Sequence, residues 1–281
     1  MKIASWNVNS IRTRIIQVID WINIKNPDVL CLQETKVIDE DFPTKPFKDL
    51  GYEVVVFGQK SYNGVAILSR IPIHDVKLGF LGELKNNEQI IKYEDQKRII
   101  SVLINEIRII NVYVPNGSSP DSEKFEYKLK WLEHFSEYLN AQEKRNENTC
   151  IVGDFNIAPT NNDLHTPDKH EGSIMATKIE RETLKNLLNK RFIDSFRVFE
   201  KNYGFWSWWD YRNNAFALNK GWRIDHIYIS NNLLSNLKSS VIDSSPRGNI
   251  QPSDHAPVMI SLDLQQFPNP FDEDDDDLFE L

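Results

Sequence analysis

The chain of 281 residues lacks any apolar run of the roughly 18 residues that a membrane-spanning helix requires. Its first residues, 1–6, read as a strand and lack the apolar core and the cleavage site of a secretory signal peptide. These two absences predict a cytoplasmic protein that has no membrane partner.

Cysteine is scarce, since Cys31 and Cys150 are the two in the chain. Both lie inside apolar runs that read as strands. The prediction is therefore two buried free thiols in a cytosolic protein, in preference to a disulfide or a reactive thiol.

Net positive charge is lacking, because the formal charge is −8. The last residues, 271–281, contain seven acidic side chains and no basic one, so residues 1–270 carry a charge of −1. A nearly neutral body does not exclude nucleic acid as a partner, because a local basic patch decides phosphate binding. The composition predicts one domain over residues 1–264 and a disordered acidic tail over 265–281.

Strands outnumber helices in the pattern of apolar residues. Helical spacing predicts helices from residue 11, where Ser10 would be the N-cap, and over 122–139, 178–188 and 192–199. Strands are predicted over 2–8, 29–32, 52–57, 64–69, 97–105, 107–114, 149–155, 223–230 and 258–264, with a weaker one near Val241. The strands form two blocks with hairpins, and this favours a four-layered α/β sandwich over a doubly wound parallel sheet. In such a sandwich two mixed or mostly antiparallel sheets pack against each other and are flanked by helices.

The segment 150–159 (CIVGDFNIAP) brings a carboxylate and a carboxamide to the end of a predicted strand. Because alternate residues of an extended segment face the same side, Asp154 and Asn156 are expected to face one spot. Gly153 removes a side chain just before that spot, and Pro159 stops the strand. Taken alone, the pair has a second interpretation, since Asp and Asn are common turn formers at strand ends.

Other apolar runs also end at polar side chains, and strand ends on one side of a sheet form a crevice. The set comprises Asn7, Glu34, Tyr113, Asp154, Asn156, Asp225, Asp254 and His255. Its four carboxylates would repel one another unless a cation lay among them or some of them carried protons. Oxygen ligands without thiolates suit Mg²⁺ or Mn²⁺ better than Zn²⁺. Such a site fits hydrolysis of a phosphate ester, with His255 donating to a phosphate oxygen; the alternative is a histidine buried at a sheet end.

Six short segments carry a family resemblance: 5–9 (SWNVN), 32–36 (LQETK), 111–117 (NVYVPNG), 153–159 (GDFNIAP), 223–226 (RIDH) and 253–257 (SDHAP). Together and in this order they resemble the exonuclease III branch of the exonuclease/endonuclease/phosphatase superfamily, from Met1 to about Leu264. The resemblance implies a Mg²⁺- or Mn²⁺-dependent DNA repair nuclease that acts as a monomer on double-stranded DNA. The implied activities are 3′→5′ exonuclease, endonuclease at abasic sites, and phosphatase or phosphodiesterase at 3′ ends.

The resemblance also implies roles for the matching positions. Glu34 would be the principal metal ligand, with Asn7 beside it. Asp154 would be the base that orients the attacking water, and Asn156 would bind the phosphate. Tyr113 would stabilise the transition state or the leaving group.

Three further positions complete the implied site. Asp225 would orient Asn156 or assist in the metal region. Asp254 would hold and polarise His255, which would grip the scissile phosphate. The metal region as a whole is predicted to include Asn7, Glu34, Asp154, Asn156, Asp254 and His255.

DNA contacts are predicted at Lys124, Trp208 and Arg212. Lys124 stands where the family usually has a phosphate-contacting lysine, although a solvated lysine in a first helical turn fits as well. The segment 208–212 (WWDYR) resembles the family segment that inserts beside an abasic site or the last base pair. Two neighbouring rings, Trp206 and Trp209, are expected in the core.

The loop over 219–223 adds positive charge next to that aromatic segment. It carries Trp222, where the family often has a smaller apolar residue, and the sequence leaves open whether Trp222 contacts DNA.

Two alternative functions stand against the DNA repair nuclease. One is a phosphodiesterase or phosphatase of the same superfamily that acts on small or lipid phosphates; Tyr113, the tryptophan segment and Arg212 disfavour it. The other is a catalytically inactive nucleic-acid-binding module. It is disfavoured because no matched position carries an inactivating replacement.

Overall fold

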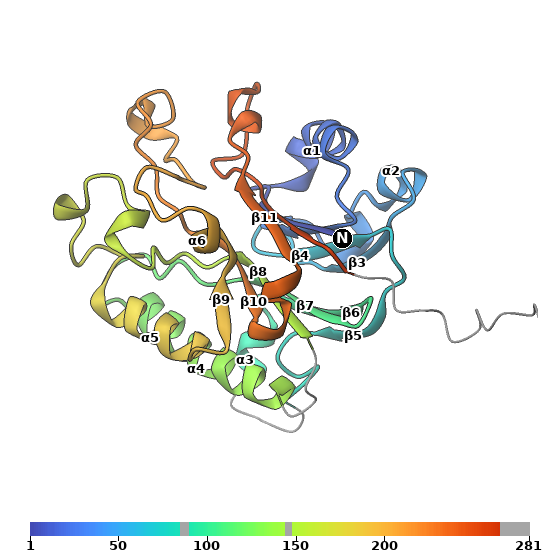
Figure 1. Ribbon diagram of the computed structural model, residues 1–281, viewed down its shortest axis with the longest axis horizontal. Coiled ribbons are helices and arrows are strands. Elements are labelled where there is room, and N and C mark those ends of the chain that lie inside the picture. The colour runs from blue at the N-terminus through green and yellow to red at the C-terminus, as the bar shows by residue number, and fades with distance from the viewer. Residues whose placement is uncertain (85–89, 144–147, 265–281) are drawn as a thin grey trace, which may run out of the picture.

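The computed structural model describes residues 1–84, 90–143 and 148–264. Two six-stranded mixed sheets form its centre, and helices cover both outer faces (Figure 1). This is the predicted four-layered α/β sandwich. The tail over 265–281, which the composition predicts to be disordered, lies outside the described residues.

The first sheet joins the two ends of the domain, because its central strand is the first of the chain and a neighbour is the last. Its order is β11 (Leu237–Ile242), β12 (Val258–Leu262), β1 (Lys2–Asn7), β2 (Val29–Gln33), β4 (Val65–Ser69) and β3 (Glu53–Phe57). β1 runs parallel to β2 and antiparallel to β12, and the remaining pairs are antiparallel.

The second sheet is ordered β5 (His74–Leu78), β6 (Ile99–Ile104), β7 (Ile107–Tyr113), β8 (Asn148–Asp154), β10 (Asp225–Ser230) and β9 (Phe192–Asp194). Its β7 and β8 are parallel and its other pairs are antiparallel. Read across each sheet in the order given, the pair directions are the same. The two strand blocks of the sequence therefore form sheets with the same pattern of parallel and antiparallel pairs.

The four layers form because the strands carry apolar side chains on both faces, so each sheet packs against the other sheet on one side and against helices on the other. On β1, Ile3 packs into the core between the sheets, whereas Ala4 and Trp6 pack outward against a helix. The first outer layer consists of α1 (Ile11–Lys25) and α2 (Thr44–Asp49); the second consists of α3 (Ile91–Glu94), α4 (Glu123–Glu143) and α5 (Lys178–Leu188). Cys31 and Cys150 are both free and buried between the sheets, as predicted.

Most predicted strands are confirmed within a few residues, including the hairpin of β6 and β7. Its turn residues Asn105 and Glu106 both have positive φ, which the twist of a two-residue hairpin turn requires. Ser10 occupies the N-cap position of α1, but its side chain makes no capping hydrogen bond. No helix among the described residues is long and apolar enough to cross a membrane.

The helix predicted over 192–199 is wrong in its first part. Residues Phe192–Asp194 form β9, which pairs with β10, and α6 (Ser195–Phe199) follows. The Asp194 carboxylate accepts hydrogen bonds from the amides of Phe196 and Arg197 and so starts the helix there. The edge strand β5 and the short α2 and α3 were not predicted from the sequence; β5 is mostly exposed and polar, so it lacks the apolar pattern that marks a buried strand.

Candidate active site

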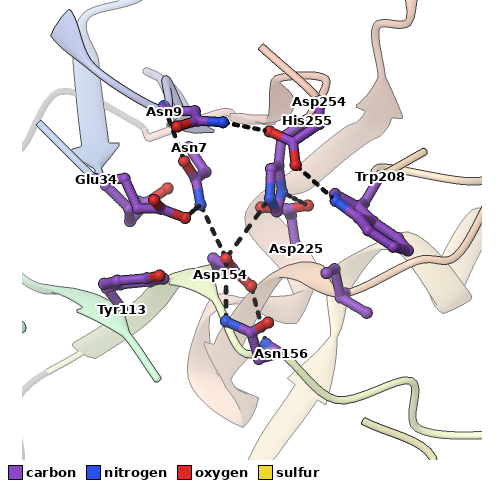
Figure 2. Close-up of polar contacts among 12 residues, drawn as sticks. Asn7, Asn9, Glu34, Tyr113, Asp154, Asn156, Trp208, Asp225, Asp254 and His255 are labelled. Atoms are coloured by element: carbon purple, nitrogen blue, oxygen red, sulfur yellow. Dashed lines mark hydrogen bonds and ion pairs between the residues drawn. The ribbon is translucent and has the colours of Figure 1, made fainter. Parts of the chain in front are cut away.

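The polar side chains predicted at strand ends come together at one end of the two sheets (Figure 2). Asn7 ends β1, and Tyr113 and Asp154 end the parallel neighbours β7 and β8, where they are paired in register. Asp225 starts β10 directly opposite Asp154, because β10 is antiparallel to β8. Strand direction therefore brings these distant parts of the chain to one place.

Asn7 joins two carboxylates of the cluster. Its fully buried side chain donates hydrogen bonds from Nδ2 to Glu34 Oε1 (2.8 Å) and to Asp154 Oδ2 (2.9 Å). Its Oδ1 accepts a hydrogen bond from the Asn9 amide (3.0 Å). Asn7 thus lies beside Glu34, as the resemblance implied, but in this arrangement it braces the carboxylates and its oxygen is already bonded.

Two residues of the cluster were missed by the sequence reasoning. Lys36 Nζ lies 2.9 Å from Glu34 Oε2 and donates to Asn9 Oδ1 (2.5 Å). Asn9 in turn donates from Nδ2 to Asp254 Oδ1 (3.0 Å). Each stands two positions after a predicted site residue, Asn9 after Asn7 and Lys36 after Glu34, so the spacing that singled out Asp154 and Asn156 could have found them.

The partner of His255 is Asp225, and the prediction that Asp254 would hold this histidine is wrong. His255 Nδ1 lies 2.9 and 3.1 Å from the two Asp225 oxygens, and its Nε2 lies 3.8 Å from Asp154 Oδ2. Asp254 instead accepts hydrogen bonds from Trp208 Nε1 (2.9 Å) and from Asn9. Asp254 lies in a bend of the chain, where Asn9 and Trp208 hold its carboxylate, so it does not pair with the adjacent His255.

Asp225 also differs from its predicted role. Apart from His255, its carboxylate accepts a hydrogen bond from Ser207 Oγ (2.7 Å), and within the described part of the chain none comes from Asn156. Ser207 Oγ itself accepts from the Ile224 and Asp225 amides. Asp225 is thereby fixed from behind and orients the imidazole.

Asn156 lies next to Asp154, as predicted, but not through the extended backbone that the spacing assumed, because β8 ends at Asp154 and Asn156 has φ of 49°. Its amide donates to Asp154 Oδ1 (2.9 Å), and its Nδ2 donates to Val114 O (3.0 Å) and to Asp154 Oδ2 (3.2 Å). Its Oδ1 accepts from Asn116 Nδ2 (3.0 Å). Gly153 is required before this turn, because with φ of 148° a Cβ there would lie 1.9 Å from Val112 O.

Burial and neighbouring charges shift the pKa values of the cluster in useful directions. Burial raises the pKa of Asp154, and the charges of Asp225 and Glu34 raise it further, although His255 opposes them. Burial lowers the pKa of His255, but Asp225 and Asp154 outweigh burial and raise it well above its usual range. Burial also raises the pKa of Glu34, but Lys36 and Asn7 more than offset this, so the net pKa is lowered. The cluster thus combines an ionised Glu34, an imidazolium at His255 and a carboxylate at Asp154 that accepts a proton readily.

Tyr113 faces the same centre, below Glu34 in the view of Figure 2. Burial, followed by the charge of Glu34, raises its pKa well above the usual range, so the ring carries a phenol that can donate a hydrogen bond. Arg98 was not predicted: its guanidinium lies 4.5 Å from the centre of the Tyr113 ring and donates to Tyr113 O (3.1 Å). A cavity of about 700 Å³ adjoins Tyr113 and is lined in part by Arg98, Asn116 and Lys124.

The tryptophans differ in burial, and the two that were expected in the core are found there. Trp206 and Trp209 are buried, whereas Trp208 is half-buried and reaches Asp254. Trp222 is buried and packs edge-on against Trp208, with ring centres 6.1 Å apart. Arg212 has an exposed side chain, 82%, that pairs with Asp210 (2.7 Å).

Arg223 is not part of the positively charged surface that the loop 219–223 suggested. Its guanidinium is 1% exposed and lies between the carboxylates of Asp163 (2.6 Å) and Asp194 (2.6 Å). Arg223 is therefore a structural residue that fixes this loop from inside.

The donor set fits a hard divalent cation. Atoms of Glu34, Asp154 and His255 that can bind a metal all lie within 4.8 Å of one another. The raised pKa of His255 and its bond to Asp225 favour the protonated ring, which cannot bind a metal. The carboxylate oxygens of Glu34 and Asp154, which both accept hydrogen bonds from Asn7, are then the candidate ligands, and oxygen ligands suit a hard divalent cation.

Two packed mixed sheets with a cluster of carboxylates, imidazolium and phenol at their common end define an α/β-sandwich hydrolase with a candidate metal-binding site. The chain belongs to the Endonuclease/Exonuclease/phosphatase family, whose model matches residues 4–255.

Similar proteins cover nearly the whole chain. Exodeoxyribonuclease III of Haemophilus influenzae is 34% identical over 266 residues, which are 92% of this chain and 98% of that protein. Among solved structures, the 3′ phosphatase NExo from Neisseria, bound to product DNA hairpin, has a TM-score of 0.88 at 38% identity and covers 94% of this chain and 100% of its own. An AP endonuclease from Archaeoglobus fulgidus has a TM-score of 0.87 at 38% identity, with the same coverage.

Proposed function

We propose that this protein is a divalent-metal-dependent DNA repair nuclease that hydrolyses phosphodiesters at abasic sites and at 3′ ends of duplex DNA. The observation that carries the proposal is the pairing of Asp154 with Asn156 between Glu34 and the His255–Asp225 pair, all at one end of the sheets. The names of the similar proteins, an exodeoxyribonuclease III, a 3′ phosphatase bound to DNA and an AP endonuclease, support DNA as the substrate.

The residues divide the work of hydrolysis among them. Asp154 takes the proton of the attacking water, since its raised pKa makes it a competent base near neutral pH. The His255 imidazolium, oriented by Asp225, donates from Nε2 to a phosphate oxygen. Asn156 donates to the same phosphate the side-chain N–H that it directs to Asp154 in this structure. Tyr113 donates its phenolic proton toward the leaving oxygen. A bound Mg²⁺ or Mn²⁺, held through Glu34, would neutralise charge on the phosphate and the leaving group, while Asp154 acts as the base.

The duplex is held on both sides of this centre. On one side the cavity beside Tyr113 presents Arg98 and Lys124, which suit phosphates flanking the reacting one. On the other side the half-buried Trp208 and the exposed Arg212 suit an unstacked base or a sugar without a base.

A comparison of substrates tests the proposal. The purified protein is incubated with a labelled duplex carrying one abasic analogue, a blunt duplex, a duplex with a 3′-phosphate and a soluble phosphoinositide, each with Mg²⁺ and with chelator. We expect Mg²⁺-dependent cleavage of the DNA substrates and none of the phosphoinositide. Hydrolysis of the phosphoinositide alone would favour the small-phosphate alternative, and no hydrolysis of any phosphodiester would favour the inactive binding module.

Changing Glu34 to glutamine is expected to raise the Mg²⁺ concentration for half-maximal cleavage by about 10-fold or more, because the metal loses a charged ligand. The size of the side chain is kept, so duplex binding in chelator should be unchanged. Cleavage is titrated with Mg²⁺ in parallel with Glu40→Gln, which changes an exposed carboxylate. An unchanged Mg²⁺ requirement in the Glu34 variant would remove Glu34 from the metal site.

Deleting residues 271–281 is expected to tighten duplex binding most at low salt, because seven acidic residues that repel phosphate are removed. The gain should shrink between about 0.01 M and 0.15 M salt, as the screening length falls from about 30 to 8 Å. The dissociation constant is measured across this range, with a full-length control in which the seven acids are changed to amides. Equal affinities of wild type and truncation at low salt would contradict the expectation.

A further inference from the structure

A buried ion pair lies directly behind the phosphate-binding asparagine. Lys128 belongs to α4 and Glu180 to α5, and neither side chain has any exposed surface. The Lys128 ammonium lies 2.5 Å from Glu180 Oε1, and it also donates to Asn156 O (2.7 Å) and Asn116 O (3.2 Å). Its three partners account for all three N–H groups of an ammonium.

The two carbonyls that Lys128 binds belong to the pair of asparagines that meet at the site. Asn116 Nδ2 donates to Asn156 Oδ1, and Asn156 Nδ2 donates onward to Asp154. The backbone of Asn156 is held in the left-handed region, with φ of 49°, which a non-glycine residue adopts at some cost. Lys128 therefore fixes the backbone at Asn156, whose side-chain amide binds the phosphate, and the backbone at Asn116, which bonds to that side chain.

Glu180 is itself held rigidly. It forms the capping box of α5 with Thr177, accepting from the Thr177 amide (3.0 Å) and hydroxyl (2.7 Å), and it accepts from the Met175 amide (3.1 Å). The position of Lys128 is thus fixed by the start of α5, and the charge it brings close to the site is neutralised.

We propose that Lys128 is a positioning residue for catalysis: through the carbonyls of Asn156 and Asn116 it sets the orientation of the Asn156 side chain, with Glu180 as its counter-ion. The inference rests on the proposed role of Asn156 in binding phosphate. A second lysine–glutamate pair joins Lys77 of the edge strand β5 to Glu83 (2.6 Å), with side chains that are 9% and 4% exposed. It serves as the matched comparison, because Lys77 pairs with Asp75 and Glu83 and not with either asparagine.

The experiment compares Lys128→Met/Glu180→Gln with Lys77→Met/Glu83→Gln on the abasic duplex. Each double change removes both charges, which avoids leaving one buried charge without a partner. We expect kcat to fall about 10- to 100-fold in the Lys128 variant with KM within about 3-fold, because misplacement of a positioning group acts on the reacting geometry. The Lys77 variant should keep kcat within about 2-fold.

Combining the Lys128 change with a change of Asn156 distinguishes a positioning role of Lys128 from a general loss of structure. In an Asn156→Ala background the Lys128→Met/Glu180→Gln change should cause no further loss of kcat, because Lys128 acts through Asn156. Losses that multiply would overturn the proposal, as would an unchanged kcat in the Lys128 variant. Should that variant fail to fold, Lys128→Arg keeps the charge beside Glu180 but alters the donors to the two carbonyls, and its kcat is expected to fall at an unchanged melting temperature.

Hydrogen exchange tests the positioning without relying on activity. Amides over 113–118 and 154–159 should exchange faster in the Lys128 variant, while those of β5 stay unchanged. If wild type cleaves no DNA but exchange rises as expected, the proposed function fails, and what stands is that Lys128 holds the segments of Asn116 and Asn156 in place. If wild type cleaves DNA and exchange at these segments is unchanged, the positioning role fails and the proposed function stands.

Discussion

Changing Asp154 to asparagine is expected to lower kcat on an abasic duplex by about 10³-fold, the scale of a general base. Asp154 is 1% exposed, its pKa is raised, and its Oδ2 lies 3.8 Å from the His255 imidazole and 2.9 Å from Asn7. The asparagine keeps the size of the side chain and an oxygen for the Asn7 hydrogen bond. It loses the ability to take a proton from water, so the loss should fall on the chemical step.

Two measurements distinguish an effect on the chemical step from an effect on DNA binding: single-turnover cleavage, and the affinity for duplex in chelator. The rate constant should fall while the dissociation constant changes by less than about 3-fold. Asp41→Asn, which changes an exposed carboxylate by the same chemistry, is the control and should leave both quantities unchanged. A loss of less than about 10-fold in the Asp154 variant would assign the base to another residue.

The strand-end residues could be predicted because apolar runs mark where strands end. Asp154 and Asn156 face one spot, as their spacing implied, and parallel β7 and β8 bring Tyr113 beside Asp154. The sequence could not supply the partner of His255. That pairing depends on β10 placing Asp225 opposite Asp154, whereas adjacency in the chain favoured Asp254.

Supporting residues were missed for two different reasons. Lys128 follows Phe125 by three positions and precedes Leu132 by four, so it lies on the apolar face of α4, where a lysine is unusual enough to predict a buried partner. Arg98 belongs to no sequence motif that marks it as a site residue. Its place over the Tyr113 ring follows from the β6–β7 register. A charged residue on the apolar face of a helix can therefore be recognised in the sequence, whereas a contact that depends on how two strands are aligned cannot.

Changing Arg223 to methionine is expected to lower the free energy of unfolding by about 3 kcal/mol, the lower end of the range for breaking a buried ion pair, because Asp163 keeps one of its two cationic partners and the partly buried Asp194 loses the guanidinium that binds both of its oxygens. Arg223 lies 2.6 Å from Asp163, which is fully buried, and binds both oxygens of Asp194. Arg197 remains beside Asp163 (2.5 Å) but does not bind Asp194 through its guanidinium. Urea unfolding at neutral pH measures the loss. Arg12→Met is the matched control, since Arg12 and Asp41 form an exposed pair that should contribute less than about 1 kcal/mol.

The same variant should show a weaker dependence of stability on pH. Burial raises the pKa of Asp163, but Arg223 and then Arg197 outweigh burial and hold it well below the usual range. Ionised Asp163 therefore stabilises the wild type above the pKa of the unfolded chain, about 3.9, and this contribution is lost as the pH falls below that value. Without Arg223 the pKa of Asp163 rises, so the difference in unfolding free energy between wild type and variant should be complete at pH 7 and narrow below about pH 4. A difference that stays constant across this range would show that the loss comes from packing around the guanidinium, and not from its charge.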